Sequence, residues 1–376
     1  MGKKIVAAGH ICLDITPVIP ERESGDIGDI LSPGRLINVG KADIHTGGSV
    51  ANTGLAMKLF GADVYLAGKI GSDAFGGMIE IIAAGYGAQG GLIRKEGEST
   101  SYSVVLAVPG KDRIFLHHPG ANDTFSADDL SDGLLQGAAI FHFGYPPLMR
   151  NVYENGGAEL VRILKKARSA GAAASVDMAA VDPNSRAGHA DWRAILANAL
   201  PYTDIFVPSA EELMFMLDRE RWQRLCGEAK GGDMTDVLSL ERDVVPMAEE
   251  CIAMGAKIVL IKCGAPGMYL HTADEKAIAA IPPALGLDAK SWAGRRIFEK
   301  SFVPDRILSG TGAGDTCAAA LLTAMAEGYP PEKCVALAAA AGACCVTEYD
   351  ALSGLLPLPE LEKKIASGWK KTERSI

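Results

Sequence analysis

The sequence lacks the features that mark several common classes of protein. No apolar stretch reaches the roughly 20 residues of a membrane span, and the longest late one, 334–347, is rich in alanine and predicts a buried helix. The formal net charge of −9 argues against a nucleic-acid-binding protein, which usually presents a basic face. None of the eight cysteines forms a CxxC pair, and most lie in apolar runs, so we expect reduced thiols in a cytoplasmic protein.

Two nucleotide-binding motifs are missing as well. GxxxxGK[ST] occurs nowhere in the chain, which disfavours a P-loop NTPase. A dinucleotide-binding dehydrogenase would carry GxGxxG after its first strand, whereas this chain has Ala7-Ala8-Gly9-His10 there. The negative net charge does not exclude an anionic ligand, because glycine-rich loops bind phosphate locally.

What the chain does contain is the composition and rhythm of an α/β protein. Its 48% hydrophobic and 22% charged residues are typical of a globular domain. Short β-rich runs lie at 4–8, 64–67, 103–108, 140–143, 174–177, 205–207 and 257–262. Helical stretches lie at 50–60, 158–170, 210–217 and 245–254. This alternation predicts a mainly parallel central sheet flanked by helices on both faces.

Three segments interrupt the alternation. Residues 17–44 are polar and glycine-rich, and residues 100–118 alternate like exposed antiparallel strands. We therefore expect a small β-strand lid over a ligand site, formed by segments of about 12–45 and 98–120. The segment of about 218–243 is charged and irregular, which predicts a surface insertion. No shift in composition marks a second domain, so we expect a single α/β domain over 1–376.

The sharpest motif is the glycine-rich loop Gly310–Asp315, which precedes an Ala/Leu-rich helix at 316–326. Glycines let the backbone approach a ligand closely, and the start of a helix presents unpaired N–H groups that bind phosphate. An Asp in a first turn can also be a plain helix cap, so the loop alone leaves both interpretations open. If phosphate binds here, Asp315 could take a proton from an attacking hydroxyl.

A second loop, Gly47-Gly48, opens another helix and leads to Asn52. Alone it is typical of a tight turn with an ordinary N-cap. Paired glycines also leave room for a sugar ring, and the Asn52 amide can both donate to and accept from hydroxyls. Asp14 follows the first strand, at the carboxyl end where open α/β sheets place their ligands. Asp177 also ends a strand, either as a cap or as a neighbour of bound phosphates.

In their order along the chain, these motifs resemble those of the ribokinase-like (PfkB) family of carbohydrate and nucleoside kinases. The family's Asp-Thr-x-Gly-Ala-Gly-Asp motif corresponds to 309–315, and its Gly-Gly-x-x-x-Asn motif to 47–52, with similarity continuing through 59–73. The run 120–122 and the strand and turn at 261–267 are similar as well. The resemblance covers almost the whole chain and implies a ribokinase-like kinase fold.

The resemblance also implies roles for particular residues. Asp315 would be the base that takes the substrate proton, and Glu212 would organise Mg²⁺, although a solvated Glu in a first helical turn is its plain alternative. The other implied residues are an anion hole at Gly312, Ala313 and Gly314, a substrate site at Asp14, Gly47, Gly48 and Asn52, and an ATP site at Lys262, Gly264 and Gly267. Gly267 could instead serve only as a hairpin turn.

The chain departs from the family pattern at two places. Ser209 stands where the family's Asn-x-x-Glu motif has Asn, which bears on the phosphate and Mg²⁺ network. Ser309-Gly310 replaces Asp-Thr, and that Asp is associated with a monovalent-cation site in related enzymes, so activation by K⁺ stays open. Neither change touches Asp315.

We therefore expect a cytoplasmic, ATP-dependent phosphotransferase that uses ATP and Mg²⁺ to phosphorylate a hydroxyl of a small sugar. Two alternatives stay open: a nucleoside kinase of the same family, for which the lid aromatics Tyr102 and Phe115 are few, and a catalytically silent sugar-binding scaffold. The expected partners are the sugar and ATP, with no nucleic acid and no membrane. A homodimer through the lid is a further prediction, because exposed strand edges invite pairing.

Overall fold

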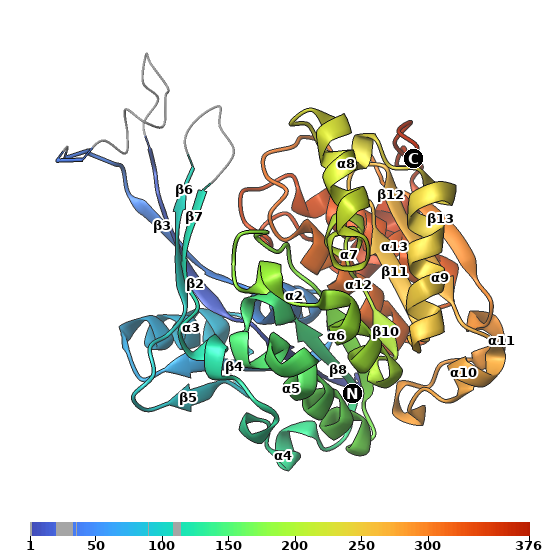
Figure 1. Ribbon diagram of the computed structural model, residues 1–376, viewed down its shortest axis with the longest axis horizontal. Helices are drawn as coiled ribbons and strands as arrows, with labels where there is room; N and C mark the ends of the chain where they lie inside the picture. The colour runs from blue at the N-terminus through green and yellow to red at the C-terminus, as the bar shows by residue number, and fades with distance from the viewer. Residues whose placement is uncertain (1, 20–32, 35, 89, 108–113) are drawn as a thin grey trace.

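The computed structural model describes residues 2–19, 33–34, 36–88, 90–107 and 114–376 (Figure 1). Its larger sheet has nine strands in the order β13-β12-β11-β10-β9-β8-β1-β4-β5. These strands are β1 (Lys4–Gly9), β4 (Asp63–Gly71), β5 (Ile93–Lys95), β8 (Ala138–Gly144), β9 (Ala173–Asp177), β10 (Ile205–Phe206), β11 (Ile258–Lys262), β12 (Gly267–Thr272) and β13 (Arg296–Lys300). The pairings from β11 to β5 are parallel, whereas β12 and β13 join one edge in antiparallel pairs. The central sheet is thus mainly parallel, as the sequence predicts.

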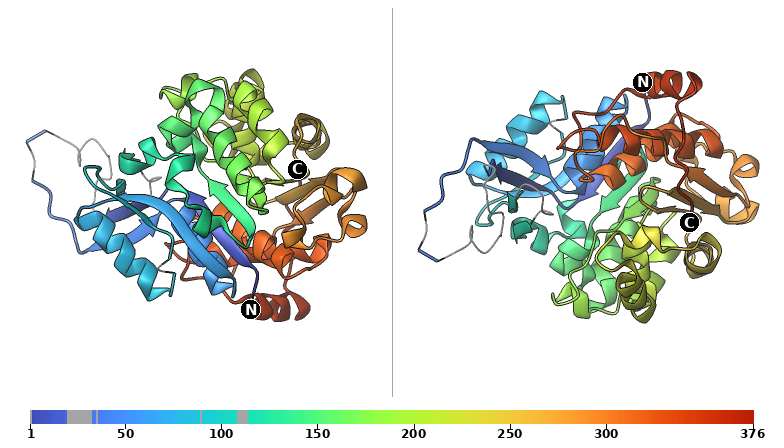
Figure 2. Two further views of the ribbon diagram at one scale, coloured as in Figure 1. Left: turned by 90° about the horizontal axis from the view of Figure 1, so that it is seen from below. Right: turned by 90° about the horizontal axis from the view of Figure 1, so that it is seen from above.

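Helices cover both faces of this sheet, as the two views of Figure 2 show. Successive residues of β1 explain why both faces are apolar, since Ile5 and Ala7 belong to one hydrophobic cluster and Val6 and Ala8 to the other. The first cluster includes residues of α2 (Ser49–Leu59), α3 (Ala74–Gly85), α10 (Glu275–Ala279), α11 (Ala289–Trp292), α12 (Ala313–Ala326), α13 (Pro331–Cys345) and α14 (Leu358–Ala366). The second includes residues of α4 (Asp132–Leu135), α5 (Arg150–Ser169), α6 (Trp192–Ala199), α7 (Ala210–Leu217), α8 (Arg219–Ala229) and α9 (Val245–Met254).

The smaller sheet projects from the body on one side (Figure 1) and has the strand order β3-β2-β6-β7. Its strands are β2 (Cys12–Pro17), β3 (Ala42–Gly47), β6 (Tyr102–Leu106) and β7 (Ile114–His118). The outer pairs are antiparallel, and β2 and β6 run parallel in the middle. These strands come from the two segments in which the sequence predicts a lid, and the parts of those segments at 20–32, 35 and 108–113 lie outside the described residues. We refer to β3-β2-β6-β7 as the lid sheet.

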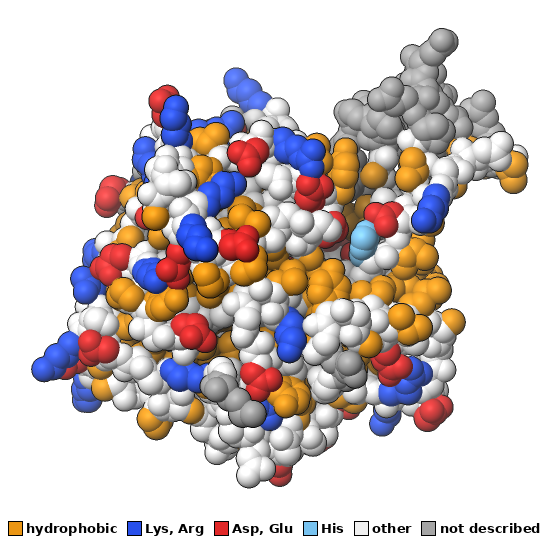
Figure 3. Space-filling model, turned by 180° about the vertical axis from the view of Figure 1, so that it is seen from behind, with side chains coloured by type: hydrophobic (Ala, Val, Ile, Leu, Met, Phe, Trp, Pro, Cys, Tyr) orange, Lys and Arg blue, Asp and Glu red, His pale blue; other side chains and the backbone are white. Residues whose placement is uncertain are grey.

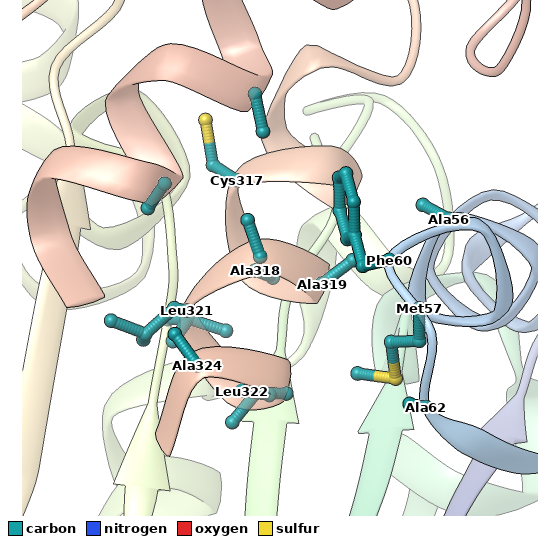
Figure 4. Packing of buried hydrophobic residues seen from close by; sticks show 14 of the residues in the cluster. Ala56, Met57, Phe60, Ala62, Cys317, Ala318, Ala319, Leu321, Leu322 and Ala324 are labelled. Atoms are coloured by element: carbon teal, nitrogen blue, oxygen red, sulfur yellow. The ribbon is translucent and has the colours of Figure 1, made fainter. Parts of the chain in front are cut away.

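Helices α2 and α12 lie side by side on one face of the central sheet (Figure 4). Ala319 of α12 lies beside Phe60, the residue that directly follows α2. Small side chains let two helix backbones approach closely, and interiors are packed without gaps. This packing brings together the N-terminal ends of the two helices, which carry the two glycine-rich loops.

The segment 218–243 differs from the expectation. Residues 219–229 form the helix α8, in which Leu225 is buried and Trp222 packs edge-on against Phe215 of α7, with ring centroids 5.1 Å apart. These two apolar residues are three positions apart and therefore share one helix face. The interpretation of the whole segment as irregular is wrong, because the many charged residues of 219–229 belong to an amphipathic helix. That the segment is a surface insertion stays a prediction.

Basic and acidic side chains are interspersed over the face that Figure 3 shows. All eight cysteines lie in the described part of the chain and are free thiols. Within the described ranges, no helix has both the length and the apolar character that crossing a membrane would need.

Candidate active site

The glycine-rich loop 310–315 opens helix α12. Gly312 is the N-cap residue with φ 76°, in the left-handed region, and a Cβ added there would collide with Ala351. Both the turn and the close packing therefore require glycine. The amide of Ala313 donates to the carbonyl of Gly310 at 3.3 Å, and Asp315 lies in the first helical turn with only 2% of its surface exposed. The loop thus places a buried carboxylate at the start of a helix.

The carboxylate of Asp315 accepts hydrogen bonds from three side chains. Asn52 Nδ2 donates to Oδ2 at 3.0 Å, and Thr53 Oγ1, the next residue of α2, donates to Oδ1 at 3.1 Å. The hydroxyl of Tyr145 donates to Oδ2 at 2.6 Å. Burial raises the pKa of Asp315 above its ordinary value, while the three donors and Lys262 oppose the rise. The carboxylate therefore has a fixed orientation and an elevated pKa.

A buried ion pair borders this carboxylate. Lys262 Nζ, at the end of β11, lies 2.8 and 2.9 Å from the two carboxylate oxygens of Asp177, at the end of β9. A Cβ added to Gly314 would lie 3.2 Å from the same Nζ, so the ammonium group faces the first turn of α12. The position of Lys262 beside the helix start suits an anion bound there.

The charges in this cluster do not balance. Burial raises the pKa of Asp177 to about 7 against the pull of Lys262, and the charges of Glu212 and Asp315 add to the rise. Burial alone would lower the pKa of Lys262, but the carboxylates of Asp177, Glu212 and Asp315 raise it. Three carboxylates around one ammonium group leave excess negative charge, which favours a bound cation.

Glu212 lies in the first turn of α7, where it forms a capping box with Ser209. The amide of Ser209 donates to Oε2 of Glu212 at 2.8 Å, and the amide of Glu212 donates to the Ser209 hydroxyl at 3.3 Å. The capping box occupies one carboxylate oxygen and leaves the other for a ligand. Among the residues that the structure describes, no group of three or more His, Cys, Asp or Glu side chains could hold a metal by itself. Mg²⁺ needs only one or two carboxylates beside the phosphates of ATP, so the second oxygen of Glu212 is compatible with this ion, whereas Lys262 occupies both carboxylate oxygens of Asp177.

The second glycine loop joins the lid sheet to α2. Gly47 ends β3 and packs against Asp14 of β2 so closely that an added Cβ would collide with the carboxylate. At Gly48, with φ 82°, a Cβ would lie 2.5 Å from Nδ1 of His10. Nε2 of His10 lies 3.3 Å from Nε2 of His117 in β7. The predicted substrate residues Asp14, Gly47 and Gly48 are therefore gathered where the lid sheet meets the body.

Of the remaining predicted ATP residues, Gly264 lies in the turn between β11 and β12, and Gly267 begins β12. Gly264 has φ 64°, and Gly267 has φ 145° and lies against the carbonyl of Glu299 in β13. The hairpin alone accounts for both glycines, and their contact with ATP stays a prediction. Ser309, at the altered cation position, accepts a hydrogen bond from the Thr311 amide at 3.0 Å and so closes a turn; activation by K⁺ also stays open.

Two residues at the site, Thr53 and Tyr145, were not predicted from the sequence. Thr53 directly follows Asn52, so its place in the first turns of α2 was a usable signal. Tyr145 directly follows β8, at the carboxyl edge of the parallel strands, and the rule that singled out Asp14 would have found it too. Asn122, within the run 120–122, has a structural task, since its side chain donates to the Ile11 carbonyl and accepts from the Ile11 amide.

Known proteins share this sequence pattern. The profile of the pfkB family carbohydrate kinases matches residues 3–357. A protein of Archaeoglobus fulgidus named as an uncharacterized sugar kinase is 25% identical over 305 residues, which are 80% of this chain and 98% of the relative. The ribokinase of Arabidopsis thaliana is 25% identical over 323 residues, which are 83% of this chain and 70% of the relative.

Solved structures share the fold. The structure of Arabidopsis thaliana ribokinase complexed with ribose and ATP superposes with a TM-score of 0.69 at 21% identity, over 96% of this chain and 98% of the other. The fructokinase of Xylella fastidiosa with bound ATP gives a TM-score of 0.67 at 20% identity, over 98% and 99%. The fold is therefore ribokinase-like, and the chain belongs to the pfkB family of carbohydrate kinases, as an ATP-dependent carbohydrate kinase.

Proposed function

We propose that this protein transfers the γ-phosphoryl group of ATP to a hydroxyl of a small free sugar, with Asp315 as the base. One observation carries the proposal: a buried carboxylate, oriented by three donors, lies in the first turn of a helix beside the ammonium group of Lys262. A base and an anion site are thereby next to each other, which is what attack of a hydroxyl on a phosphate requires.

The transfer follows from this arrangement. The acceptor hydroxyl gives its proton to Asp315 as its oxygen bonds to the γ-phosphorus. The bond from that phosphorus to the β–γ bridging oxygen breaks, and its electron pair leaves with ADP. Backbone N–H groups of Gly312, Ala313 and Gly314 and the ammonium of Lys262 stabilise the charge that builds on the γ-phosphoryl oxygens, with the Ala313 N–H exchanging its 3.3 Å bond to the Gly310 carbonyl for the phosphate. The protein thus contributes mainly position and fixed charge.

Mg²⁺ would be held by Glu212, and when bound it would neutralise phosphate charge. The excess of carboxylates in the site supports this assignment. Burial is the main cause of the raised pKa of Asp177, but the carboxylates of Asp177, Glu212 and Asp315 raise the pKa of Lys262, as expected in a field that favours positive charge.

The sugar would lie where the second glycine loop meets the lid sheet. The carboxylate oxygens of Asp14 can accept hydrogen bonds from sugar hydroxyls, and Gly47 and Gly48 add no side chain beside the backbone there. Asn52 uses its Nδ2 group on Asp315 and retains a carbonyl oxygen for a substrate hydroxyl. The base and the substrate residues would therefore be connected through one amide.

The lid sheet is also our proposed dimer surface, since Ile44 on β3 and Leu116 on β7 expose 40% and 55% of their surface on its two edge strands. Light scattering on the wild type and on Leu116→Glu tests this assignment. A dimer that the substitution dissociates is expected, and a wild-type monomer at micromolar concentration would contradict it.

A coupled ADP-release assay with ATP and Mg²⁺ over a panel of sugars, sugar acids, cyclitols and nucleosides tests the proposed function. We expect turnover with free sugars and little with nucleosides. Turnover confined to nucleosides would contradict the substrate assignment. Silence over the whole panel, with ATP still binding in calorimetry, would favour a silent scaffold.

A further inference from the structure

Tyr145 lies against the reacting carboxylate in an unusual backbone conformation. It directly follows β8 and has φ 65° and ψ 45°, in the left-handed region that residues other than glycine seldom adopt. Its amide donates to the carbonyl of Asp177 at 3.2 Å, and its own carbonyl accepts from the amide of Leu148 at 3.0 Å. These bonds hold the turn in place, and the partly exposed side chain reaches Asp315 with its hydroxyl at 2.6 Å. A strained turn that places a polar group on a reacting atom points to a functional role.

The donors on Asp315 are distributed unequally between its two oxygens. Oδ2 accepts from Asn52 Nδ2 at 3.0 Å and from the Tyr145 hydroxyl at 2.6 Å. Oδ1 accepts from Thr53 Oγ1 at 3.1 Å. An ionised carboxylate has about two acceptor positions on each oxygen. Oδ2 is therefore filled, and Oδ1 retains one position for a further donor.

We propose that Tyr145 is a positioning residue that, together with Asn52, holds Oδ2 of Asp315 and thereby makes Oδ1 the atom that takes the substrate proton. This inference rests on the proposed function, because it assumes that Asp315 is the base. When the hydroxyl attacks, its O–H bond breaks, the proton passes to Oδ1, and the bonds from Tyr145 and Asn52 to Oδ2 persist. The direction from which the hydroxyl approaches is then set by the turn after β8.

The bond from Tyr145 also affects the charge of the base. Burial raises the pKa of Asp315, and the Tyr145 hydroxyl is foremost among the groups that lower it. The groups facing this carboxylate are Asn52 and Thr53 of α2, Tyr145 after β8, and Lys262 and Asp177 at the ends of β11 and β9. Removing the hydroxyl takes away a donor to the ionised form, so Asp315 should hold its proton more tightly.

The first test needs no turnover. The ¹³Cγ resonance of Asp315, assigned by its loss in Asp315→Asn, is titrated in ligand-free wild type and in Tyr145→Phe. We expect its midpoint to be about one pH unit higher in Tyr145→Phe, as for loss of a hydrogen bond to a charged group. Tyr153→Phe is the matched control, since Tyr153 is a buried tyrosine that packs on Trp192. Equal midpoints in Tyr145→Phe and wild type would overturn the proposal.

The second test uses the sugar that the panel identifies. In Tyr145→Phe we expect kcat to fall about tenfold, the acidic limb of its pH profile to move upward, and the KM for ATP to stay within about twofold. Site-specific 3-fluorotyrosine at 145 keeps the shape and donates more strongly, so it should move the limb downward; it also replaces Tyr145→Phe if that variant does not fold. An unmoved limb in both variants would reduce Tyr145 to a packing role.

The two tests separate the failures. If no sugar is turned over but the titration midpoint of Asp315 moves as expected, the proposed function is wrong. Tyr145 then positions a carboxylate that is not a catalytic base. If sugars are turned over and neither the midpoint nor the limb moves, the proposed function stands and the inference is wrong.

Discussion

The glycines at the two ends of α12 provide a sharp test of how the anion site is built. Gly312 precedes the helix with φ 76°, and Gly328 follows it with φ 79°. A Cβ added at Gly328 meets nothing within 4 Å, whereas one added at Gly312 would collide with Ala351. Gly312→Ala and Gly328→Ala thus share the backbone strain and differ in the collision.

The magnitudes follow from these two contributions. Left-handed backbone costs a residue with a Cβ about 1–2 kcal/mol, and this is the whole effect expected for Gly328→Ala. Forcing an extra methyl group into packed surroundings costs a further ~1–3 kcal/mol. This second cost applies only to Gly312→Ala. We therefore expect Gly312→Ala to lose about 2–5 kcal/mol in the free energy of unfolding. Because the collision displaces the loop that carries Asp315, its kcat should also fall, while Gly328→Ala should stay within about twofold of wild type.

Urea unfolding followed by circular dichroism measures the first quantity, and the ADP-release assay measures the second. Ala351→Gly removes the methyl group that collides, so it should recover part of the stability of Gly312→Ala and none of that of Gly328→Ala. Equal loss of stability in the two single variants, or no recovery in the double variant, would refute the reasoning.

Three further predictions concern charged groups. Asp204→Ala should lower the free energy of unfolding by about 3 kcal/mol with kcat unchanged. The carboxylate of Asp204 is fully buried, its oxygen lies 2.6 Å from Nζ of Lys257, and it also pairs with Arg168, so the substitution leaves both cations without their partner. The value of kcat/KM should fall as the pH drops through the pKa of Asp315, because the protonated acid cannot take a proton. Burial raises this pKa, so the midpoint of the fall in kcat/KM should lie above the ordinary value of 3.8. Lys262→Met should lower kcat on the order of a hundredfold, because an ammonium group beside the anion site is lost.

Matched controls accompany these variants. Asp128→Ala removes one partner of the exposed ion pair with Arg162 and should leave stability nearly unchanged. Lys276→Met removes an exposed ammonium on α10 and should leave kcat unchanged. An equal effect of Asp128→Ala and Asp204→Ala, an acidic midpoint below 3.8, or full activity in Lys262→Met would each contradict the corresponding prediction.

Local pattern predicted much of the fold. Helices α7 and α9 have the bounds expected from apolar spacing, and Gly255 ends α9, because such signals act within a few residues. The helix α8 was missed because few apolar residues, among them Trp222 and Leu225, mark its buried face among many charges. The antiparallel strands β12 and β13 were not predicted as strands either, and their pairing depends on a partner strand rather than on local spacing.

At the site, the positions of functional residues were easier to predict than their hydrogen-bond and ion-pair partners. Glycine motifs placed Asp315 and Asn52 because left-handed turns and helix starts have a local signature. The bond between their side chains joins residues 263 positions apart, and the ion pair of Lys262 and Asp177 joins residues 85 apart. Such pairs are created by the packing of α2 on α12 and by strand order in the central sheet, which a single sequence does not display. The position of Tyr145 after β8 was a usable signal, but its bond to Asp315, 170 positions away, depends on the same packing.

The central claim is that Asp315 is the base of a sugar kinase, and Asp315→Asn tests it most directly. With the sugar identified by the panel, ADP release and the phosphorylated sugar are measured for wild type, Asp315→Asn and the control Asp274→Asn, which alters an exposed helix cap on α10. We predict a loss in kcat of about 10²–10⁴-fold in Asp315→Asn, with an unchanged melting temperature and with full activity in the control. Sugar phosphorylation at near wild-type rate by folded Asp315→Asn would contradict the account.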